Sequence, residues 1–178
     1  GTAIADALFG KVNPGGKLPV TVARNVGQLP NFYNYKPSAR RGYLFDEVTP
    51  LYPFGFGLSY TNFEMSAPTL SATTIKAGQP VTVTTTVTNT GDVAGDEVVQ
   101  VYLRDEISSV TRPVKELAGF QRVTLQPGES RAVSIPIEPR SLMMWNREME
   151  RVIEPGDFTI MVGPNSQDLQ DVTLTVVP

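Results

Sequence analysis

A period-two alternation of β-branched residues runs through the chain from residue 67 onward and constrains its fold more than any other feature. In the first run, Val81, Val83 and Val87 alternate with threonines. Such alternation is typical of strands that bury one face and expose the other. The pattern recurs in five further runs: Val99/Val101/Leu103, Ala118/Phe120, Val133/Ile135/Ile137, Phe158/Ile160/Val162 and Val172/Leu174/Val176.

Turn signals separate these runs. They are Asn89-Thr90-Gly91-Asp92, Gln126-Pro127-Gly128-Glu129, Glu154-Pro155-Gly156-Asp157 and Gly163-Pro164-Asn165. About seven short strands in about 110 residues, with no helical period, indicate an immunoglobulin-like sandwich. Because the chain contains no cysteine, the fibronectin-III variety is favoured over a disulfide-bonded antibody-type domain. We predict a mainly β chain with a fibronectin-III-like β-sandwich over residues 67–178.

Residues 1–23 have a different pattern. Residues 1–10 predict a short helix with Ile4 and Leu8 on one face and Gly10 as its end. A Gly/Pro turn over 13–16 and an alternating run over 18–22 follow, so that helix, turn and strand form the last helix–strand unit of an α/β sandwich domain. So short a helix is unstable alone. The start also lacks Met and any signal-peptide pattern, so we expect an upstream part of a longer protein to cover it.

Residues 24–66 are rich in proline, glycine and aromatic residues and keep neither a helical nor a strand period. The rings are Phe32, Tyr33, Tyr35, Tyr43, Phe45, Tyr52, Phe54, Phe56, Tyr60 and Phe63. A flexible linker would be polar and rich in glycine and serine, and so many exposed rings would be costly. We predict that this segment, here called the strap, lies across other protein surface.

Composition removes several chemistries. With no histidine and no cysteine, the chain excludes Ser-His-Asp and Cys-His catalysis and imidazole-bound zinc within itself. Its net charge of −3 gives no reason to expect nucleic acid or an anionic membrane as a partner, and its apolar runs are too short to span a bilayer. We expect no cofactor and no metal.

Several segments resemble glycoside hydrolase family 3 in the right order. The marker is Pro50-Leu51-Tyr52-Pro53-Phe54-Gly55-Phe56-Gly57-Leu58-Ser59-Tyr60-Thr61, preceded by Ala7-Leu8-Phe9-Gly10-Lys11-Val12-Asn13-Pro14-Gly15-Gly16-Lys17-Leu18-Pro19. Three later segments also match: residues 87–102, residues 112–120 and Glu154-Pro155-Gly156-Asp157-Phe158. Together they cover nearly the whole chain.

The resemblance implies the C-terminal portion of a retaining exo-acting β-glycosidase, with β-glucosidase first and β-xylosidase second. In that family the nucleophile is an Asp in a Ser-Asp-Trp type motif on an N-terminal barrel, and the glucosidases' acid/base carboxylate lies in the second domain, before residue 1. The only tryptophan here, Trp145, follows Met143 and Met144, so no catalytic residue is assigned. The implied partners are the barrel and α/β sandwich domains of the same enzyme, and through them an oligosaccharide or an aryl or alkyl glycoside. The implied location is periplasmic or extracellular.

Adjacent acids and a glycine-rich stretch admit two interpretations each. The pairs Asp46/Glu47, Asp96/Glu97 and Asp105/Glu106 point to opposite faces of an extended chain, so we favour solvated acids over a catalytic pair. Asp92, Asp96 and Glu97 near a turn lack the spacing of an EF-hand calcium site, and turn chemistry explains them. Gly55 and Gly57 match no phosphate-binding motif, and we expect them to permit close backbone approach or a positive φ.

The strap and Trp145 also leave alternatives open. Arg41 and Tyr43 would be substrate-adjacent if the strap passed the catalytic pocket, although packing and surface ion pairs are the favoured role for this stretch. Trp145 is expected to fill one end of the sandwich core, with an exposed carbohydrate platform as the alternative. The rival functions are a non-catalytic carbohydrate-binding module and an adhesion-type β-sandwich.

Overall fold

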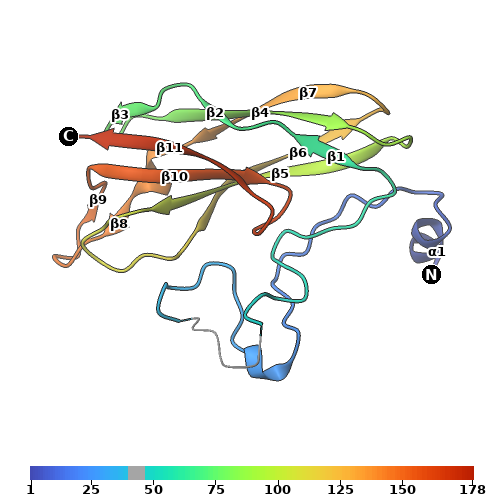
Figure 1. The fold of residues 1–178 in the computed structure, drawn as a ribbon, viewed down its shortest axis with the longest axis horizontal. Coiled ribbons are helices and arrows are strands. Elements are labelled where there is room, and N and C mark those ends of the chain that lie inside the picture. The colour runs from blue at the N-terminus through green and yellow to red at the C-terminus, as the bar shows by residue number, and fades with distance from the viewer. Residues whose placement is uncertain (40–46) are drawn as a thin grey trace.

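The computed structural model describes residues 1–39 and 47–178, and the second range is mostly a two-layer β-sandwich (Figure 1). One sheet contains β1 (Phe63–Met65), β2 (Thr69–Leu70), β4 (Val81–Asn89) and β7 (Ser130–Ile137). The other has the order β3 (Thr74–Lys76), β11 (Gln170–Val177), β10 (Gly156–Gly163), β5 (Gly95–Asp105) and β6 (Glu116–Leu125). The prediction of a fibronectin-III-like sandwich is confirmed.

Antiparallel neighbours make up most of both sheets. One edge of β4 pairs with β7 over residues 81–88. The other edge of β4 pairs first with β2 and then, further along, with β1. In the second sheet β5 lies between β6 and β10, and the β10–β11 hairpin continues the sheet to β3, which pairs with β11 in parallel. The β6–β7 turn needs one residue in the left-handed region, and Gly128 takes it with a φ of +72°.

The core lies between the two sheets and is built from the predicted alternating residues. Val81, Val83 and Val87 of β4 face Val99, Val101 and Leu103 of β5, and all six are buried. Burial of apolar side chains at about 25 cal/mol per Å² is the main force holding such a sandwich. The largest fully buried side chains include Phe158, Leu125, Ile137, Ile160 and Leu174.

β6 departs from the predicted pattern because of a β-bulge. The register of β5 and β6 shifts between Val101 and Tyr102, where Ala118 has no direct partner. A bulge inserts one residue and reverses the in–out alternation beyond it. Ala118 packs against the core while Phe120 is exposed, so the expectation that both face inward is wrong for Phe120.

Trp145 also differs from the expectation. After the short helix α2 (Pro139–Leu142), strand β8 (Met144–Trp145) pairs with β9 (Arg151–Val152) at one end of the sandwich. Leu142 and Met144 are buried there, and alternation turns Trp145 outward, where 56% of it is exposed. Its ring lies 6.0 Å from the guanidinium carbon of Arg151. The predicted core role of Trp145 is therefore wrong.

The part of the chain before the sandwich contains little regular structure. Helix α1 (Thr2–Leu8) forms as predicted, with Gly10 just beyond it at a φ of +73°, and none of its residues is buried. The strand expected over 18–22 is reduced to one bridge between Val22 and Tyr52, because its neighbour is the returning strap rather than a sheet. A 3-10 turn, η1 (Val26–Gln28), follows. Among the described residues no helix is long and apolar enough to cross a bilayer.

Candidate functional site

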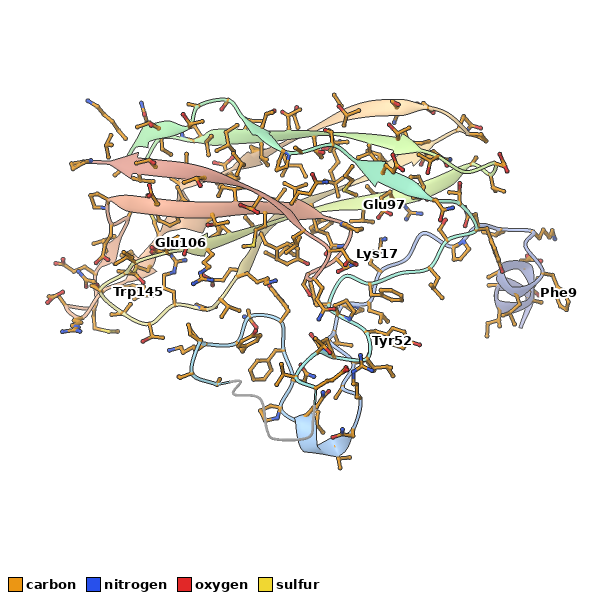
Figure 2. The ribbon with its side chains drawn as sticks, viewed as in Figure 1. Phe9, Lys17, Tyr52, Glu97, Glu106 and Trp145 are labelled. Atoms are coloured by element: carbon orange, nitrogen blue, oxygen red, sulfur yellow. The ribbon has the colours of Figure 1, made fainter. Side chains whose placement is uncertain are left out.

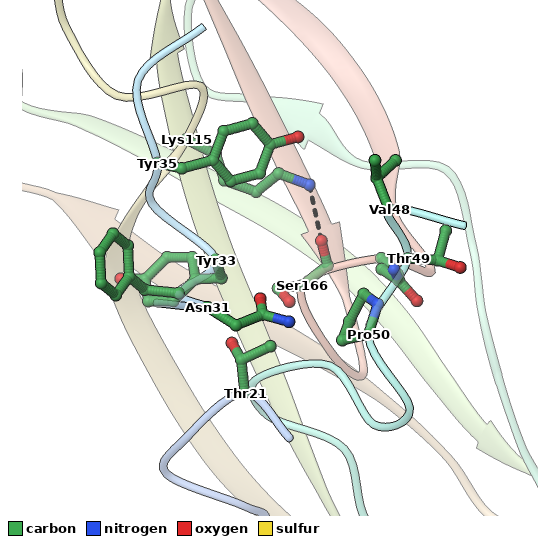
Figure 3. A pocket seen from close by; sticks show the side chains of 11 residues that line it. Thr21, Asn31, Tyr33, Tyr35, Val48, Thr49, Pro50, Lys115 and Ser166 are labelled. Atoms are coloured by element: carbon green, nitrogen blue, oxygen red, sulfur yellow. Dashed lines mark hydrogen bonds between the residues drawn. The ribbon is translucent and has the colours of Figure 1, made fainter. Parts of the chain in front are cut away.

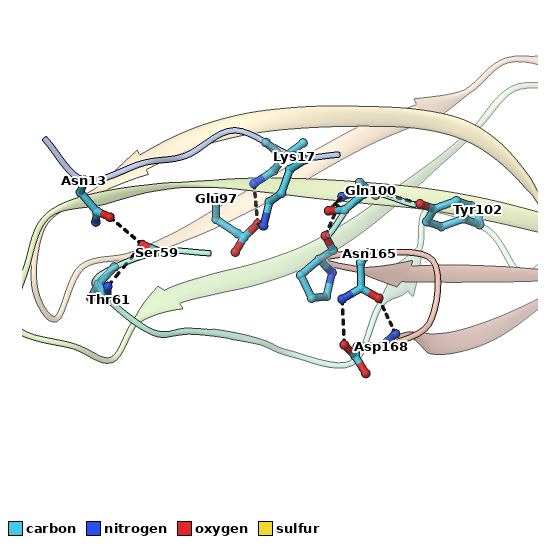
Figure 4. Close-up of polar contacts among 12 residues, drawn as sticks. Asn13, Lys17, Ser59, Thr61, Glu97, Gln100, Tyr102, Asn165 and Asp168 are labelled. Atoms are coloured by element: carbon cyan, nitrogen blue, oxygen red, sulfur yellow. Dashed lines mark hydrogen bonds and ion pairs between the residues drawn. The ribbon is translucent and has the colours of Figure 1, made fainter. Parts of the chain in front are cut away.

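The outer face of β5 carries a buried polar pair that fastens the strap to the sandwich (Figure 4). The Nε2 atom of Gln100 donates hydrogen bonds to the carbonyl oxygens of Gly55, at 3.1 Å, and Pro164, at 2.6 Å. Its Oε1 atom accepts one from the Tyr102 hydroxyl at 2.6 Å. Burial, and secondarily the nearby Tyr33, raise the pKa of Tyr102 above its usual range. These two side chains would face solvent in an isolated sandwich, and here they hold the strap.

Aromatic rings of the strap pack directly above this pair. The rings of Tyr33 and Phe54 stack with centroids 4.4 Å apart, and Tyr33 meets Tyr102 edge-on at 5.6 Å. The Tyr33 hydroxyl accepts a hydrogen bond from the backbone N–H of Leu117 on β6. Phe54 accepts one through its carbonyl oxygen from the backbone N–H of Ser166. The strap is thus packed against the five-stranded sheet through Tyr33 and Phe54, whereas Phe32, Tyr52 and Tyr60 are exposed.

A buried ion pair joins the segment before the strap to the sandwich. The Lys17 Nζ atom lies 2.6 Å from Glu97 Oε1, and the two side chains are only 15% and 8% exposed. Oε1 also accepts a hydrogen bond from the N–H of Val98 at 2.7 Å. The expectation of a solvated acid is wrong for Glu97, because a distant lysine covers it.

Asn13, which precedes Lys17 in the same segment, forms a second set of contacts with the sandwich. Its Nδ2 atom donates to the carbonyl oxygen of Ala94 at the β4–β5 turn, and its Oδ1 atom accepts from Ser59 Oγ and the N–H of Tyr60. The Tyr60 hydroxyl in turn donates to the carbonyl oxygen of Ala7 at the end of α1. The Asn13 side chain therefore ties the segment before the strap and the last part of the strap to the β4–β5 turn.

The glycines of the family marker allow these close contacts. Gly55 has a φ of +81°, and a Cβ atom there would overlap the amide of Gln100. A Cβ atom on Gly57 would lie 2.5 Å from the carbonyl oxygen of Gly16. The prediction of a positive φ or close backbone approach is confirmed at both positions.

Two further acids considered from the sequence, Asp96 and Asp105, lie beside neighbouring cations. Asp96 accepts from Thr124 Oγ1 and from Arg122, and these hydrogen bonds, Thr124 first, lower the pKa of Asp96. Asp105 pairs with Arg112 at 3.3 Å, and burial raises its pKa despite that cation. Of the acids considered for calcium, Asp96 and Glu97 are thus paired with two different cations, Arg122 and Lys17. Within residues 1–39 and 47–178 no three acidic side chains are grouped to hold a metal ion.

A cavity of about 110 Å³ lies between the strap and the β10–β11 turn (Figure 3). Lys115 lines it and donates to the Ser166 carbonyl oxygen at 2.6 Å, and burial lowers the pKa of its ammonium group. The Thr21 Oγ1 and Asn31 Oδ1 atoms on its wall are buried without a protein hydrogen-bond partner. The described residues that line the cavity include no carboxylate, so they do not themselves form the pair that glycoside hydrolysis requires.

Asp46 and the two residues predicted to be substrate-adjacent fall outside the described part of the chain. Arg41 and Tyr43 fall in residues 40–46, outside the described residues, and their substrate-adjacent role stays a prediction.

Comparison with known proteins agrees with this arrangement of a sandwich and a preceding segment. Residues 97–166 match the fibronectin type III-like domain, and residues 1–60 match the glycosyl hydrolase family 3 C-terminal domain. The chain belongs to glycoside hydrolase family 3. Family membership explains why the marker segment, the strap and the sandwich occur together in one chain.

Similar proteins extend the match to almost every residue. A β-xylosidase of Formosa agariphila is 50% identical over 99% of the chain, and a periplasmic β-glucosidase of Salmonella typhimurium is 46% identical over 93%. The solved structure of a β-glucosidase from Erythrobacter marinus superposes with a TM-score of 0.95 at 50% identity over 98% of the chain. The chain spans about a quarter of the length of each of these family 3 proteins.

Proposed function

We propose that the chain is the C-terminal part of a retaining exo-acting β-glycosidase, acting on β-glucosides first and β-xylosides second. The support is the match to proteins named β-glucosidase and β-xylosidase over more than nine-tenths of the chain. The relatives are about four times as long, so we place the catalytic carboxylates in the part of the polypeptide beyond this chain. That part would contain the barrel and α/β sandwich domains.

In this proposal the chain is a scaffold. The single observation that carries this role is the double attachment of the 1–60 region to the sandwich, through the Lys17–Glu97 ion pair and the Gln100–Gly55 hydrogen bond. Buried polar contacts of this kind hold two elements in one fixed arrangement. A sandwich attached so firmly to the end of an α/β domain would keep the catalytic domains in register.

Activity of the full-length protein tests the proposal. We expect release of nitrophenol from a β-glucoside, and more slowly from a β-xyloside, with the β-anomer of the sugar appearing first in NMR spectra. Deleting residues 67–178 should abolish turnover although no catalytic carboxylate is removed. As a matched control, Trp145→Ala on the far hairpin should leave turnover unchanged. Activity in the 178-residue chain alone, or full activity after the deletion, would contradict the scaffold role.

The domain boundaries, the location of the enzyme and its substrate-adjacent residues belong to the same proposal. We divide the chain into 1–23 as the end of the α/β domain, 24–66 as the strap and 67–178 as the sandwich. We place the enzyme in the periplasm or outside the cell, in line with the relative named periplasmic β-glucosidase. Arg41 and Tyr43 would line an outer subsite, so Tyr43→Ala in the full-length enzyme should raise KM more than it lowers kcat.

One observation favours a second candidate function, a carbohydrate-binding module. Trp145 is 56% exposed on a hairpin with Arg151 against its ring, and exposed aromatic faces stack on the C–H surfaces of sugars. Retention of the chain on insoluble glucan or xylan, lost in Trp145→Ala, would support this function. A scaffold should pass through unretained.

A further inference from the structure

Two side chains of the cavity between the strap and the β10–β11 turn have polar atoms that the scaffold role leaves unexplained. The Thr21 Oγ1 and Asn31 Oδ1 atoms are buried on the cavity wall without a hydrogen-bond partner among the described residues. Native proteins pair almost all of their buried polar atoms, because an unpaired one destabilises the fold. Both atoms therefore point to a ligand in the cavity.

Lys115 lines the same cavity from the sandwich. Its ammonium group has three N–H donors, and the hydrogen bond to the Ser166 carbonyl oxygen uses one of them. Figure 3 shows Lys115 at one side of the cavity and Thr21 and Asn31 at the other. The ligand thus meets hydrogen-bond donors on one side and acceptors on the other.

The lining favours a neutral ligand with C–H groups. The Lys115 ammonium group repels a cation, and the described lining residues include no carboxylate to attract one. The lone pairs of Asn31 Oδ1 in turn repel an anion. Ligand sites typically combine a few placed polar groups with apolar and aromatic walls, whose rings receive C–H groups. Such walls are present here, formed by Phe32, Tyr33, Tyr35, Val48 and Pro50.

The size and the opening of the cavity limit the ligand to a small unit. Its volume of about 110 Å³ corresponds to about three or four water molecules at about 30 Å³ each. A short polyol, or the diol edge of one sugar ring, brings a similar number of oxygen atoms together with C–H groups. Phe32 and Val48 on the wall are 51% and 43% exposed, so the cavity is open to solvent there.

We propose that this cavity binds one neutral polyhydroxy unit, either a small polyol or the vicinal-diol edge of a monosaccharide. One hydroxyl oxygen accepts a hydrogen bond from Lys115 Nζ. A neighbouring hydroxyl donates to Asn31 Oδ1, and Thr21 Oγ1 offers a further partner on the same side. The C–H groups lie against the aromatic wall. The site goes beyond the proposed function, and its occupation does not depend on hydrolysis.

The cavity is separate from the exposed Trp145. Figure 2 shows Trp145 at one end of the sandwich, whereas Tyr52, two residues after Pro50 of the cavity wall, lies on the strap. Binding in the cavity therefore does not depend on the Trp145 hairpin.

Methyl NMR of the full-length protein with ¹³C-labelled valine tests the proposal at the cavity itself. The Val48 signals report on the cavity wall, and Val93 on the β4–β5 turn is the control, since the two valines are 43% and 45% exposed. The probes are glycerol and methyl α-D-glucopyranoside, whose α-linkage a β-glycosidase leaves intact. We expect at least one of them to shift Val48 saturably without shifting Val93. A response to glycerol alone identifies a polyol site, and a response to the glucoside identifies a sugar site.

Dimethoxyethane separates hydroxyl recognition from simple filling of the cavity. It has ether oxygens but no O–H group to donate to Asn31 Oδ1, so it should give no saturable shift of Val48. Saturable binding of dimethoxyethane with the same affinity as the effective probe would contradict the proposed hydrogen bonds.

Substitution of the two unpaired oxygens gives a second readout. Asn31→Leu keeps most of the volume but removes the acceptor, and it should weaken binding of the effective probe by about fivefold to tenfold. Thr21→Val should also weaken binding, and it decides the matter if Asn31→Leu does not fold. The control is Thr69→Val on the exposed strand β2 of the other sheet, which should leave binding unchanged.

Two results would overturn the proposal. The first is an equal, unsaturable drift of Val48 and Val93 with both probes, because the cavity would then hold water only. The second is unchanged binding in the variants of Asn31 and Thr21. Hydrolysis of a β-glucoside is measured separately on the same protein. An active enzyme whose Val48 signals do not respond refutes only the cavity site, and a response in an inactive protein refutes only the glycosidase function.

Discussion

Replacing Lys17 by methionine removes the cation of the buried ion pair while keeping most of the side chain's length. At 2.6 Å between Nζ and Oε1, the attraction between unit charges is about 6 kcal/mol at an effective dielectric constant of about 20. Much of this attraction only offsets the free energy that is needed to remove both ions from water. Breaking such a pair from one side nevertheless costs about 3–5 kcal/mol, because the remaining charge stays buried. We expect Lys17→Met to lower the free energy of unfolding by about that amount.

Chemical denaturation of the 178-residue chain, followed by circular dichroism, measures this loss. The matched control is Arg131→Met, which breaks the pair between Arg131 and Glu129, where both side chains are at least one-third exposed. That change should cost far less, because solvent screens an exposed pair. The double variant Lys17→Met/Glu97→Met should recover most of the lost stability, because an apolar pair of similar volume leaves no buried charge. A loss in Lys17→Met no larger than in the control would refute the reasoning.

Three further predictions concern the sandwich and its attachment. Gly55 and Gly78 both have φ above +80°, but only Gly55 lacks room for a Cβ, so Gly55→Ala should cost about 1–3 kcal/mol more than Gly78→Ala in denaturation. Phe158→Ala in the buried core should cost about 3–5 kcal/mol, whereas Phe120→Ala on the exposed edge should cost little, as thermal midpoints will show. Because the pKa of Asp96 is lowered on folding, its contribution to stability is complete above the ordinary value of 3.8 and is lost as pH falls through the folded-state pKa. The free energy of unfolding, measured from pH 5 to 2, should therefore fall less steeply in Asp96→Asn than in the unaltered chain. An unchanged slope would contradict this.

The sandwich was predictable because its signal is local. Alternation at Val81, Val83 and Val87 identifies one strand without knowledge of its neighbours, and the turn glycines mark where each strand ends. The bulge at Ala118 was not predictable, since it depends on the pairing of β5 with β6 rather than on either strand alone. In a strand without a bulge Ala118 and Phe120 would share one face, so the alternation alone predicts the wrong face for Phe120.

The attachment of the strap depended on contacts between residues far apart in sequence. Glu97 is buried by Lys17, and Gln100 by the backbone of Gly55, so neither strand pattern nor composition reveals them. One signal was available in the middle of β5, where residues 98–103 carry no charge on either face although both ends of the strand are charged. A strand with few charges on either face is typically covered on both.

Residues 18–22, just before the strap, pair with residues 51–56 in the second half of the strap. Leu18 is hydrogen-bonded to Gly55 and Phe56, and Val22 to Leu51 and Tyr52, so the chain leaves the sandwich and returns to it at the same place. The stretch between Val22 and Leu51 thus starts and ends at one place, and its first part is held on the sandwich through Tyr33 and the Tyr35 carbonyl oxygen. For such a loop each doubling of length costs only about 0.6 kcal/mol. We therefore expect changes of length between Tyr35 and Leu51 to be tolerated in evolution while the sandwich and α1 keep their relative positions.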